Sequence, residues 1–205
     1  VGLDTMSYAN ALKNAMREAP DVIMIGEIRD RETMQAAMSY AETGHLCLST
    51  LHANNANQTL DRIVNFFPET AHHQLFIDLS LNLKAVISQR LLKGLDRKRV
   101  PAVEILLASA YVSDLIAKGD IATIREAMKQ GAEQGMQTFD ESLYLLYAGG
   151  RISYRDAIDH ADSRTDLSLR IRLQGPAPGI ATHAVSGPGD HSMAIEDFVE
   201  PTSKP

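Results

Sequence analysis

The sequence feature that most constrains the fold of this chain is an apolar run that ends on an acidic residue. The segment reads Asp21-Val-Ile-Met-Ile-Gly-Glu-Ile28, with no polar residue between Val22 and Ile25. That pattern favours a strand buried on both faces of a parallel sheet over one with a solvated face. Gly26 lets the backbone open, and Glu27 follows where the strand leaves the sheet. Because ligands of open α/β sheets bind at the carboxyl ends of strands, Glu27 is a candidate for holding a Mg²⁺ shell or orienting a water at a phosphate.

A second apolar run ends on a histidine. The segment Leu46-Cys-Leu-Ser-Thr-Leu51 predicts another strand, and His52 follows it directly. Residues 31–43 carry apolar side chains at helical spacing, and Gly44 then predicts a helix end. Crossovers between parallel strands are nearly always right-handed, so we expect Glu27 and His52 at the same edge of the sheet. An acid there can position water or a metal shell, and an imidazole can donate a hydrogen bond to a phosphate oxygen.

Other interpretations of these polar residues remain open on spacing alone. Arg29 and Asp30 are expected to pair with each other or with a neighbouring loop and so to hold the preceding glutamate in place. A lone buried His52, satisfied by a backbone carbonyl, accounts for the spacing about equally well. His45 and Cys47 stand two residues apart on one predicted strand, but no third or fourth ligand completes a zinc site. We therefore predict no metal site built from protein side chains alone.

The rest of the chain alternates helical and extended patterns and then becomes helical. Such alternation is typical of an α/β layered domain with a mostly parallel sheet. Within residues 167–173 apolar and polar side chains alternate, which predicts an edge strand or an extended arm. Beyond Gln174 the sequence is rich in Gly and Pro, and we expect disorder there. The other predicted elements are helices at 6–18, 56–66, 69–87, 111–118, 121–130, 139–147 and 154–160, and strands at 88–95 and 100–107 joined by a turn.

Composition and charge limit the classes of partner. With 205 residues, 44% of them hydrophobic, the chain can bury a sizeable core. Its net charge of −6 gives no general reason to bind nucleic acid or an anionic membrane, and the short basic cluster at 93–99 predicts a solvated turn. No segment approaches the roughly 20 apolar residues of a membrane span, so we expect no membrane insertion. Cys47 is the only cysteine, which excludes an intrachain disulfide.

Two segments resemble motifs of one enzyme family. Residues Ala19-Pro-Asp-Val-Ile-Met-Ile-Gly-Glu-Ile-Arg-Asp30 look like the Walker B segment of the secretion-type ATPases that drive type II secretion and type IV pili. Residues Ala41-Glu-Thr-Gly-His-Leu-Cys-Leu-Ser-Thr-Leu-His52 look like their histidine box, and the order and spacing of the two segments match. The resemblance covers about residues 1–173 and continues in Leu60-Asp-Arg-Ile-Val-Asn-Phe-Phe-Pro68, Ser88-Gln-Arg-Leu91 and Gly135-Met-Gln-Thr-Phe-Asp140.

Within this family the chain most resembles the accessory members of the pilus-retraction branch. Residues 52–57 and 149–154 and a C-terminal extension carry that likeness. The stretch Ala110–Ala117 keeps Leu115 and Ile116 but lacks both arginines that the main retraction motors have there. The resemblance implies an α/β fold in three parts: a partial RecA-like P-loop ATPase core at residues 1–108, an all-helical C-terminal subdomain at 109–173 and a Gly/Pro-rich disordered tail at 174–205.

The resemblance also implies a function. Members of this branch are hexamers in the cytoplasm, at the inner-membrane base of the pilus machine, and they hydrolyse ATP with Mg²⁺ to retract the pilus. The implied partners are further copies of the chain, a PilT-like ATPase and the inner-membrane platform protein of the pilus, but no nucleic acid. By the same resemblance Glu27 is the catalytic Walker B glutamate, and the candidates for nucleotide binding are His45, His52, Gly26, Arg29, Asp30 and Thr50.

One motif of the family does not occur in the chain. The phosphate loop, G-x-x-x-x-G-K-[ST], cradles the β- and γ-phosphates, yet no Gly-Lys dipeptide occurs in these 205 residues. Family members carry that loop, an acidic box and arginine fingers upstream of the segment that matches Val1, which is not a Met. We therefore expect the C-terminal half of a motor, which alone binds ATP weakly and turns over at background rate.

Two alternatives stay open within the resemblance. The chain is also consistent with a non-enzymatic assembly module that docks on a PilT-like hexamer and contributes no turnover. The loss of both arginines in the stretch Ala110–Ala117 supports this alternative. A type II secretion or pilus-extension ATPase is a third candidate. Those ATPases commonly insert a four-cysteine metal module, and the single cysteine of this chain argues against it.

Overall fold

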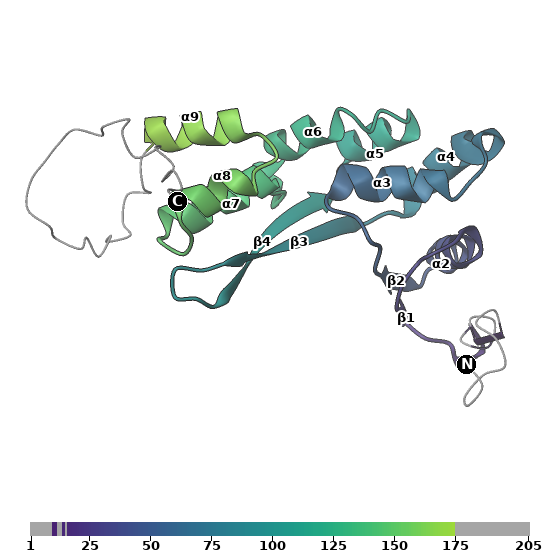
Figure 1. Cartoon of the computed structure of the whole chain (residues 1–205). Helices are drawn as coiled ribbons and strands as arrows, with labels where there is room; N and C mark the ends of the chain where they lie inside the picture. Colours follow the sequence, from purple (N-terminus) through teal and green to yellow (C-terminus); the bar gives the residue numbers. More distant parts are fainter. Residues whose placement is uncertain (1–9, 12–13, 15, 175–205) are drawn as a thin grey trace, which may run out of the picture.

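The chain folds into an elongated α/β structure (Figure 1). The computed structural model describes residues 10–11, 14 and 16–174, so most of the predicted helix at 6–18 and the predicted disordered tail beyond Gln174 lie outside the described residues. The described elements are η1 (Met16–Glu18), β1 (Val22–Ile25), α2 (Arg31–Glu42), β2 (Leu46–Ser49), α3 (Ala56–Asn65), η2 (Glu69–Ala71), α4 (His72–Asn82), β3 (Ala85–Lys93), β4 (Arg99–Leu107), α5 (Ala110–Ala117), α6 (Ile124–Gln130), η3 (Ala132–Gln134), α7 (Phe139–Ala148), α8 (Tyr154–Asp159) and α9 (Arg164–Gln174).

Strands β1 and β2 pair in parallel, with Ile23 opposite Cys47, and α2 forms the crossover between them. This confirms the prediction of two parallel strands joined by a helix. The prediction that the first strand is buried on both faces is wrong within the described residues. Ile23 and Ile25 are buried in the core that α2 shares, whereas Met24 between them is 74% exposed. The strand is apolar throughout, but the described residues cover only one of its faces.

The uncovered face of this two-stranded sheet is apolar. Alternate residues of a strand point to the same side, so Val22 and Met24 of β1 share that side with Leu46 and Leu48 of β2. All four side chains are between 47% and 74% exposed. We refer to these four residues as the uncovered face.

Strands β3 and β4 form a long antiparallel hairpin in which Val86 lies opposite Leu106. Both strands were expected, but the predicted helix at 69–87 is too long, because α4 ends at Asn82. The apolar spacing of that helix continues through Val86. Pairing with β4 nevertheless satisfies the backbone groups there, so the segment is a strand.

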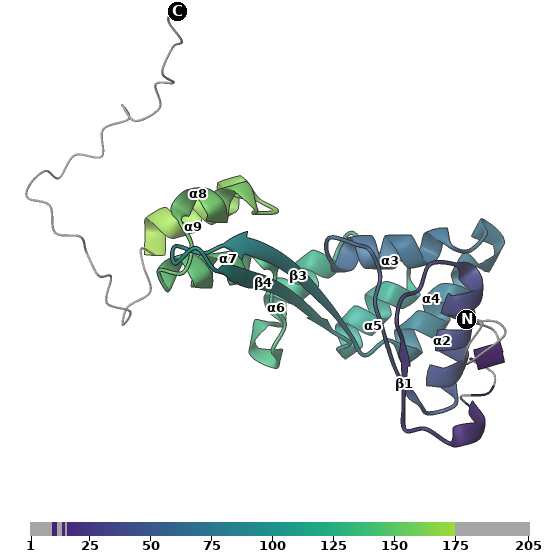
Figure 2. The same ribbon diagram turned by 60° about the horizontal axis from the view of Figure 1, so that its bottom comes forward.

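Helices cover one side of the hairpin (Figure 1). Helices α3, α6 and α7 pack directly on it, α5 packs on α4 and α6, and α8 and α9 pack on α7. Within the described residues the buried apolar side chains form two clusters. One includes Leu60 and Ile116 and joins β1, α2, α3, α4, α5 and α6; the other includes Phe139 and Leu143 and joins the distal half of the hairpin to α7, α8 and α9. Accordingly, α2 and α9 lie at opposite ends of the molecule (Figure 2).

The predicted edge strand or arm at residues 167–173 is wrong, because this stretch lies in helix α9. Leu167 and Ile171 are buried, whereas Leu169 and Leu173 are 54% and 76% exposed. Residues four apart share a helix face, so α9 buries one pair of these apolar side chains and exposes the other. The alternation of apolar residues therefore does not reflect a strand.

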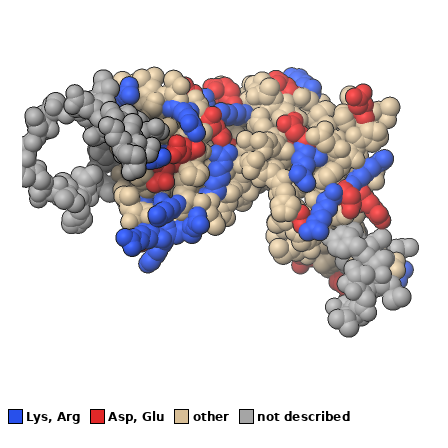
Figure 3. Space-filling model, viewed as in Figure 1, with Lys and Arg blue, Asp and Glu red and all other residues tan. Residues whose placement is uncertain are grey.

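Basic side chains gather at the free end of the hairpin (Figure 3). Lys93, Arg97, Lys98 and Arg99 are all exposed there, as a solvated turn requires.

Among the described helices, none has both the length and the hydropathy needed to cross a bilayer.

Two side-chain acceptors fix the start of α3. The N-cap Asn55 accepts a hydrogen bond from the backbone N–H of Gln58 at 2.8 Å. Glu104 of β4 accepts another from the backbone N–H of Ala56 at 2.7 Å, and Glu104 is only 3% exposed. Burial raises the pKa of the Glu104 carboxyl, and the hydrogen bond from Ala56 opposes that rise. Glu104 thus ties the hairpin to the start of α3.

The one-sided burial of β1 can be tested with two adjacent residues. Ile25→Ala should lower the free energy of unfolding by about 3 kcal/mol, because Ile25 is 1% exposed and its methyl groups fill the core. Met24→Ala, on the uncovered face, should change it by less than about 0.5 kcal/mol. Urea unfolding of the 205-residue chain, followed by circular dichroism, measures both. Equal losses would contradict one-sided burial.

The buried carboxyl of Glu104 predicts a pH-dependent stability. Because its pKa is raised in the folded state, its stabilising contribution is complete below the ordinary glutamate pKa and is lost as pH rises through the raised value. Glu104→Gln keeps an acceptor and removes the buried charge, so this loss should vanish and the variant should exceed the parent in stability at neutral pH. Glu104→Ala should cost about 2 kcal/mol, because the Ala56 N–H loses its acceptor.

Urea unfolding at several pH values between 4 and 8 measures this effect. The exposed Glu133→Gln serves as the control and should follow the parent at every pH. Identical pH slopes for the parent and for Glu104→Gln would show that the carboxyl does not titrate in this way.

Candidate functional site

The carboxyl ends of β1 and β2 lie side by side. The backbone N–H of Ile28 donates to the carbonyl of Thr50 at 3.0 Å, which extends the pairing beyond the strands. The Thr50 hydroxyl also donates to the carbonyl of Gly26. A Cβ at Gly26 would meet no atom within 4 Å, so packing of the described residues does not require glycine there. These contacts bring the segments that follow the two strands together.

Glu27, Arg29 and His52 form an ion-paired cluster at this edge. One carboxylate oxygen of Glu27 accepts a hydrogen bond from Nε of Arg29 at 2.7 Å and pairs with Nη2 of the same guanidinium at 2.5 Å. The other carboxylate oxygen lies 2.8 Å from Nε2 of His52. The Glu27 side chain is 20% exposed, but those of Arg29 and His52 are 76% and 79% exposed. The carboxylate thus sits beneath two donors that face solvent.

The electrostatics of the cluster favour the charged form of its acid. The hydrogen bond from Arg29, together with the charges of Arg29 and His52, lowers the pKa of Glu27 below its usual value despite partial desolvation. The same contact raises the pKa of Arg29. Glu27 therefore remains a carboxylate to lower pH than an isolated glutamate.

The other candidate residues have different surroundings. Asp30 turns away from the cluster and caps α2, accepting from the backbone N–H of Thr33 at 2.8 Å. His45 lies at the opposite end of β2, where its Nδ1 is 3.0 Å from the Thr43 hydroxyl. Four strand residues span about 13 Å, so the chain does not bring His45 to the same edge as His52.

The structure decides the alternative interpretation of His52. His52 is not a buried histidine satisfied by a carbonyl, because its side chain is 79% exposed and contacts Glu27. Cys47 is partly buried, and burial raises the pKa of its thiol. Among residues 10–11, 14 and 16–174, no three His, Cys, Asp or Glu side chains come close enough together to hold a metal ion.

Spacing does not identify two charged residues that hold the loop after β2. Glu104 accepts from Ala56, as described, and Nη2 of Arg90 donates to the carbonyl of Asn54 at 3.3 Å. Arg90 and Glu104 lie on the buried faces of β3 and β4, because the residues two positions before and after each of them are buried. Charged residues on a buried face are rare unless they are paired, and this is the signal that marks them.

The cluster suits a phosphate group better than a bare metal ion. Exposed guanidinium and imidazole groups are the donors that bind phosphate oxygens. Glu27 is the only acid of the cluster, and both of its oxygens are engaged. These side chains alone therefore do not provide a Mg²⁺ site, and the ligands of a Mg²⁺ ion that came with a phosphate group would be mainly phosphate oxygens and water.

Comparison with known proteins places the chain in context. Residues 3–138 match the family model described as type II/IV secretion system protein. The chain is similar to the type IV pilus ATPase PilU of Pseudomonas aeruginosa, with 58% identity across 84% of this chain and 46% of that protein. It is also similar to the type IV pilus retraction ATPase PilT of the same organism, with 41% identity across 77% of this chain and 46% of that protein. The chain thus spans about half the length of these curated relatives.

A solved structure shares the fold. The crystal structure of the pilus retraction motor PilT with bound ADP matches with a TM-score of 0.75 and 41% identity, across 82% of this chain and 48% of that one. The α/β fold of the described residues is therefore that of a PilT-like ATPase over the matched half.

The pKa of Glu27 should depend on Arg29. Arg29→Gln removes the strongest hydrogen bond to the carboxylate, so the pKa of Glu27 should rise toward the ordinary glutamate value. A ¹³C NMR titration of the side-chain carboxyl in the 205-residue chain measures it. Arg31→Gln is the matched control, because Arg31 lies over the Phe67 ring and should leave the titration unchanged. A Glu27 titration curve that Arg29→Gln leaves in place would refute the assignment.

Proposed function

The chain belongs to the type II/IV secretion system protein family, and we propose that it forms the C-terminal part of a hexameric ATPase that powers type IV pilus retraction. Its 58% identity to a PilU ATPase favours the accessory PilU type over the main retraction motor. The chain spans about half the length of such relatives and contains no Gly-Lys phosphate-loop motif. We therefore propose that the other half of the motor supplies the phosphate loop that binds the nucleotide. The 205 residues alone would then bind ATP weakly.

The observation that carries this proposal is the contact between Glu27 and His52. The two residues follow adjacent parallel strands, and their side chains meet at 2.8 Å at the carboxyl edge of the sheet. Ligands of α/β sheets bind at that edge. An acid and an imidazole in contact there are suited to a reaction at a terminal phosphate.

We assign Glu27 to the attacking water and His52 to the γ-phosphate. Glu27 accepts a hydrogen bond from the water and orients it, as its lowered pKa allows. The exposed His52 donates to a phosphate oxygen. While His52 contacts Glu27, one carboxylate oxygen is occupied, so a phosphate that attracted His52 would free that oxygen for water. Arg29 holds the other oxygen and thereby keeps Glu27 oriented.

The remaining candidates have supporting roles in this proposal. Thr50 fixes the carbonyl of Gly26, and Asp30 fixes the start of α2 immediately after the cluster. His45 would approach a nucleotide only from the other end of β2. Mg²⁺, when bound with ATP, would neutralise charge on the phosphates.

The proposed setting follows the family. The motor would assemble as a homo-hexamer, or together with a PilT-like ATPase, at the cytoplasmic base of the pilus and act on the inner-membrane platform protein. Residues 1–108 would belong to the ATPase core and 109–173 to the helical subdomain, as the sequence suggests.

A non-catalytic accessory module is the second candidate. The absence of both retraction-motor arginines from the stretch Ala110–Ala117, which forms α5, favours it. In that case the chain would dock on a PilT-like motor, and its own Glu27 would not affect turnover.

Glu27 variants of the full-length protein separate the two candidates. Glu27→Ala should reduce kcat by about 10³-fold while leaving ATP affinity within about twofold, because the residue acts on the water and not on the bound phosphates. Glu18→Ala, an exposed acid before β1, is the control. Phosphate release and fluorescent-nucleotide binding measure the two quantities. Unchanged turnover in Glu27→Ala would support the accessory module and remove Glu27 from catalysis.

A further inference from the structure

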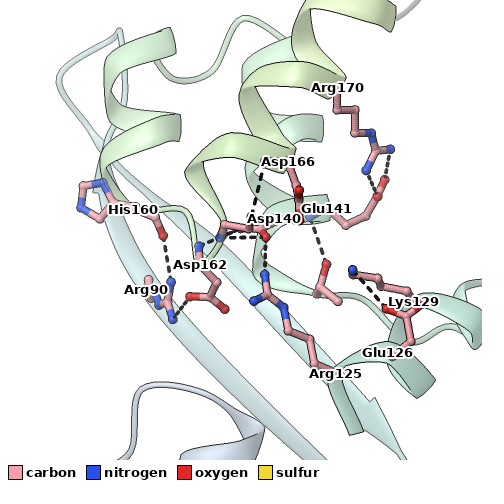
Figure 4. Close-up of polar contacts among 12 residues, drawn as sticks. Arg90, Arg125, Glu126, Lys129, Asp140, Glu141, His160, Asp162, Asp166 and Arg170 are labelled. Carbon is pink, nitrogen blue, oxygen red and sulfur yellow. Dashed lines mark hydrogen bonds and ion pairs between the residues drawn. The ribbon is translucent and has the colours of Figure 1, made fainter. Parts of the chain in front are cut away.

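Arg90 lies where the hairpin contacts helix α7 (Figure 4). Its side chain is 22% exposed and lies on the same face of β3 as Val86 and Leu92, which are buried. The guanidinium carbon stands 3.8 Å from the centroid of the Phe139 ring, a fully buried aromatic side chain of α7. A cation on an aromatic face inside a hairpin–helix contact has little freedom to move.

The guanidinium joins two segments that are distant in the sequence. On one side, Nη2 donates to the carbonyl of Asn54, in the loop between β2 and α3. On the other, Nη1 donates to the carbonyl of His160 at 2.8 Å and Nη2 pairs with Asp162 at 2.7 Å, both in the turn between α8 and α9. Arg90 is therefore a direct bridge between the loop that carries His52 and the helical subdomain.

The loop side of the bridge is short and well tethered. Asn54 follows His52 by two residues, and the backbone N–H of Ala53 donates to the carbonyl of Leu51 at 3.1 Å. Just beyond, Ala56 is held by Glu104. Only Ala53 separates Asn54 from His52 along the chain, so a displacement of Asn54 passes to His52 through a single intervening residue.

The subdomain side is equally tied. The backbone N–H of Asp162 donates to the carboxylate of Asp140 at 2.8 Å, and Asp140 also pairs with Arg125 of α6 (Figure 4). Asp140 lies in the first turn of α7, next to the Phe139 ring under Arg90. The α8–α9 turn, α7 and Arg90 thus form one contiguous set of contacts.

Only an arginine satisfies all these partners. The planar guanidinium presents donors in several fixed directions and a flat face that stacks on an aromatic ring, whereas lysine offers one compact charge. We infer that Arg90 is a positioning residue that couples His52 to the α8–α9 turn, so that movement of the helical subdomain changes the position of His52 relative to Glu27. Resting on the proposed function, this makes the helical subdomain a regulator of the hydrolysis site.

Amide hydrogen exchange of the 205-residue chain tests the coupling without any catalysis. Arg90→Lys should speed exchange of Ala53 and Ala56, and of Asp162 in the α8–α9 turn, by roughly tenfold. Asp162→Asn, which contacts Arg90 and the α8–α9 turn, should also speed exchange at Ala53. Ala56 is not the reporter for this variant, because the charge of Asp162 also acts on Glu104, the acceptor of the Ala56 N–H. Arg99→Lys on the exposed hairpin end is the matched control and should change neither segment. Exchange at Ile25 in the core monitors global stability.

The Asp162→Asn result decides between coupling and a local structural role. If only the amides of the α8–α9 turn respond, Arg90 merely holds that turn, and the proposal is overturned. If Arg90→Lys does not fold, Asp162→Asn still gives this answer on its own.

Kinetics of the full-length protein provide the second readout. Arg90→Lys should lower kcat by about 10²-fold with KM for ATP within about twofold, because His52 contacts only the terminal phosphate, whereas the phosphate loop of the other half would still hold the rest of the nucleotide. A parent protein without ATPase activity would defeat the proposed function, whereas the exchange data would still decide the coupling. Normal kcat in Arg90→Lys, in an active parent, would overturn the positioning role.

Discussion

The parallel pairing of β1 with β2 is the contact on which the rest of the structure depends. It continues past the strands through the hydrogen bond from the Ile28 N–H to the Thr50 carbonyl and the one from the Thr50 hydroxyl to the Gly26 carbonyl, so the segments after the two strands leave the sheet together. The proximity of Glu27 and His52 follows from that register. A slip of one residue would turn every side chain of a strand to the opposite face and would separate the acid from the imidazole.

Much of the fold is predictable where apolar spacing and local stop signals agree. Helix α2 lies between the cap Asp30 and the break at Gly44, and the crossover it forms follows from handedness alone. Prediction fails where tertiary contacts decide. Pairing with β4 turns Ala85–Ile87 from helix into strand, and packing on α7 makes a helix of residues 167–173. An apolar run does not show which face of β1 is covered, because that depends on the elements that pack on the strand.

The candidate site likewise has residues whose place is predictable from the sequence and residues whose place is not. Glu27 and His52 are predictable because each stands where an apolar run ends, and strand ends meet at one edge. The choice of Arg29 over Asp30 as the partner of Glu27 depends on side-chain direction, and Asp30 instead satisfies a helix end. His45 lies in the segment that resembles the histidine box but precedes β2, so its place at the other edge follows from strand length. Arg90 acts across the hairpin on residues far along the chain, and no local pattern encodes that contact.

The apolar face that the described residues leave uncovered bears on how the chain behaves in solution. Val22, Met24, Leu46 and Leu48 form a patch beside an open strand edge, and such a surface gains free energy by meeting another like it. Salts that strengthen apolar burial would promote this self-association. The four side chains thus give the purified chain a surface for self-association at the end of the molecule remote from α9.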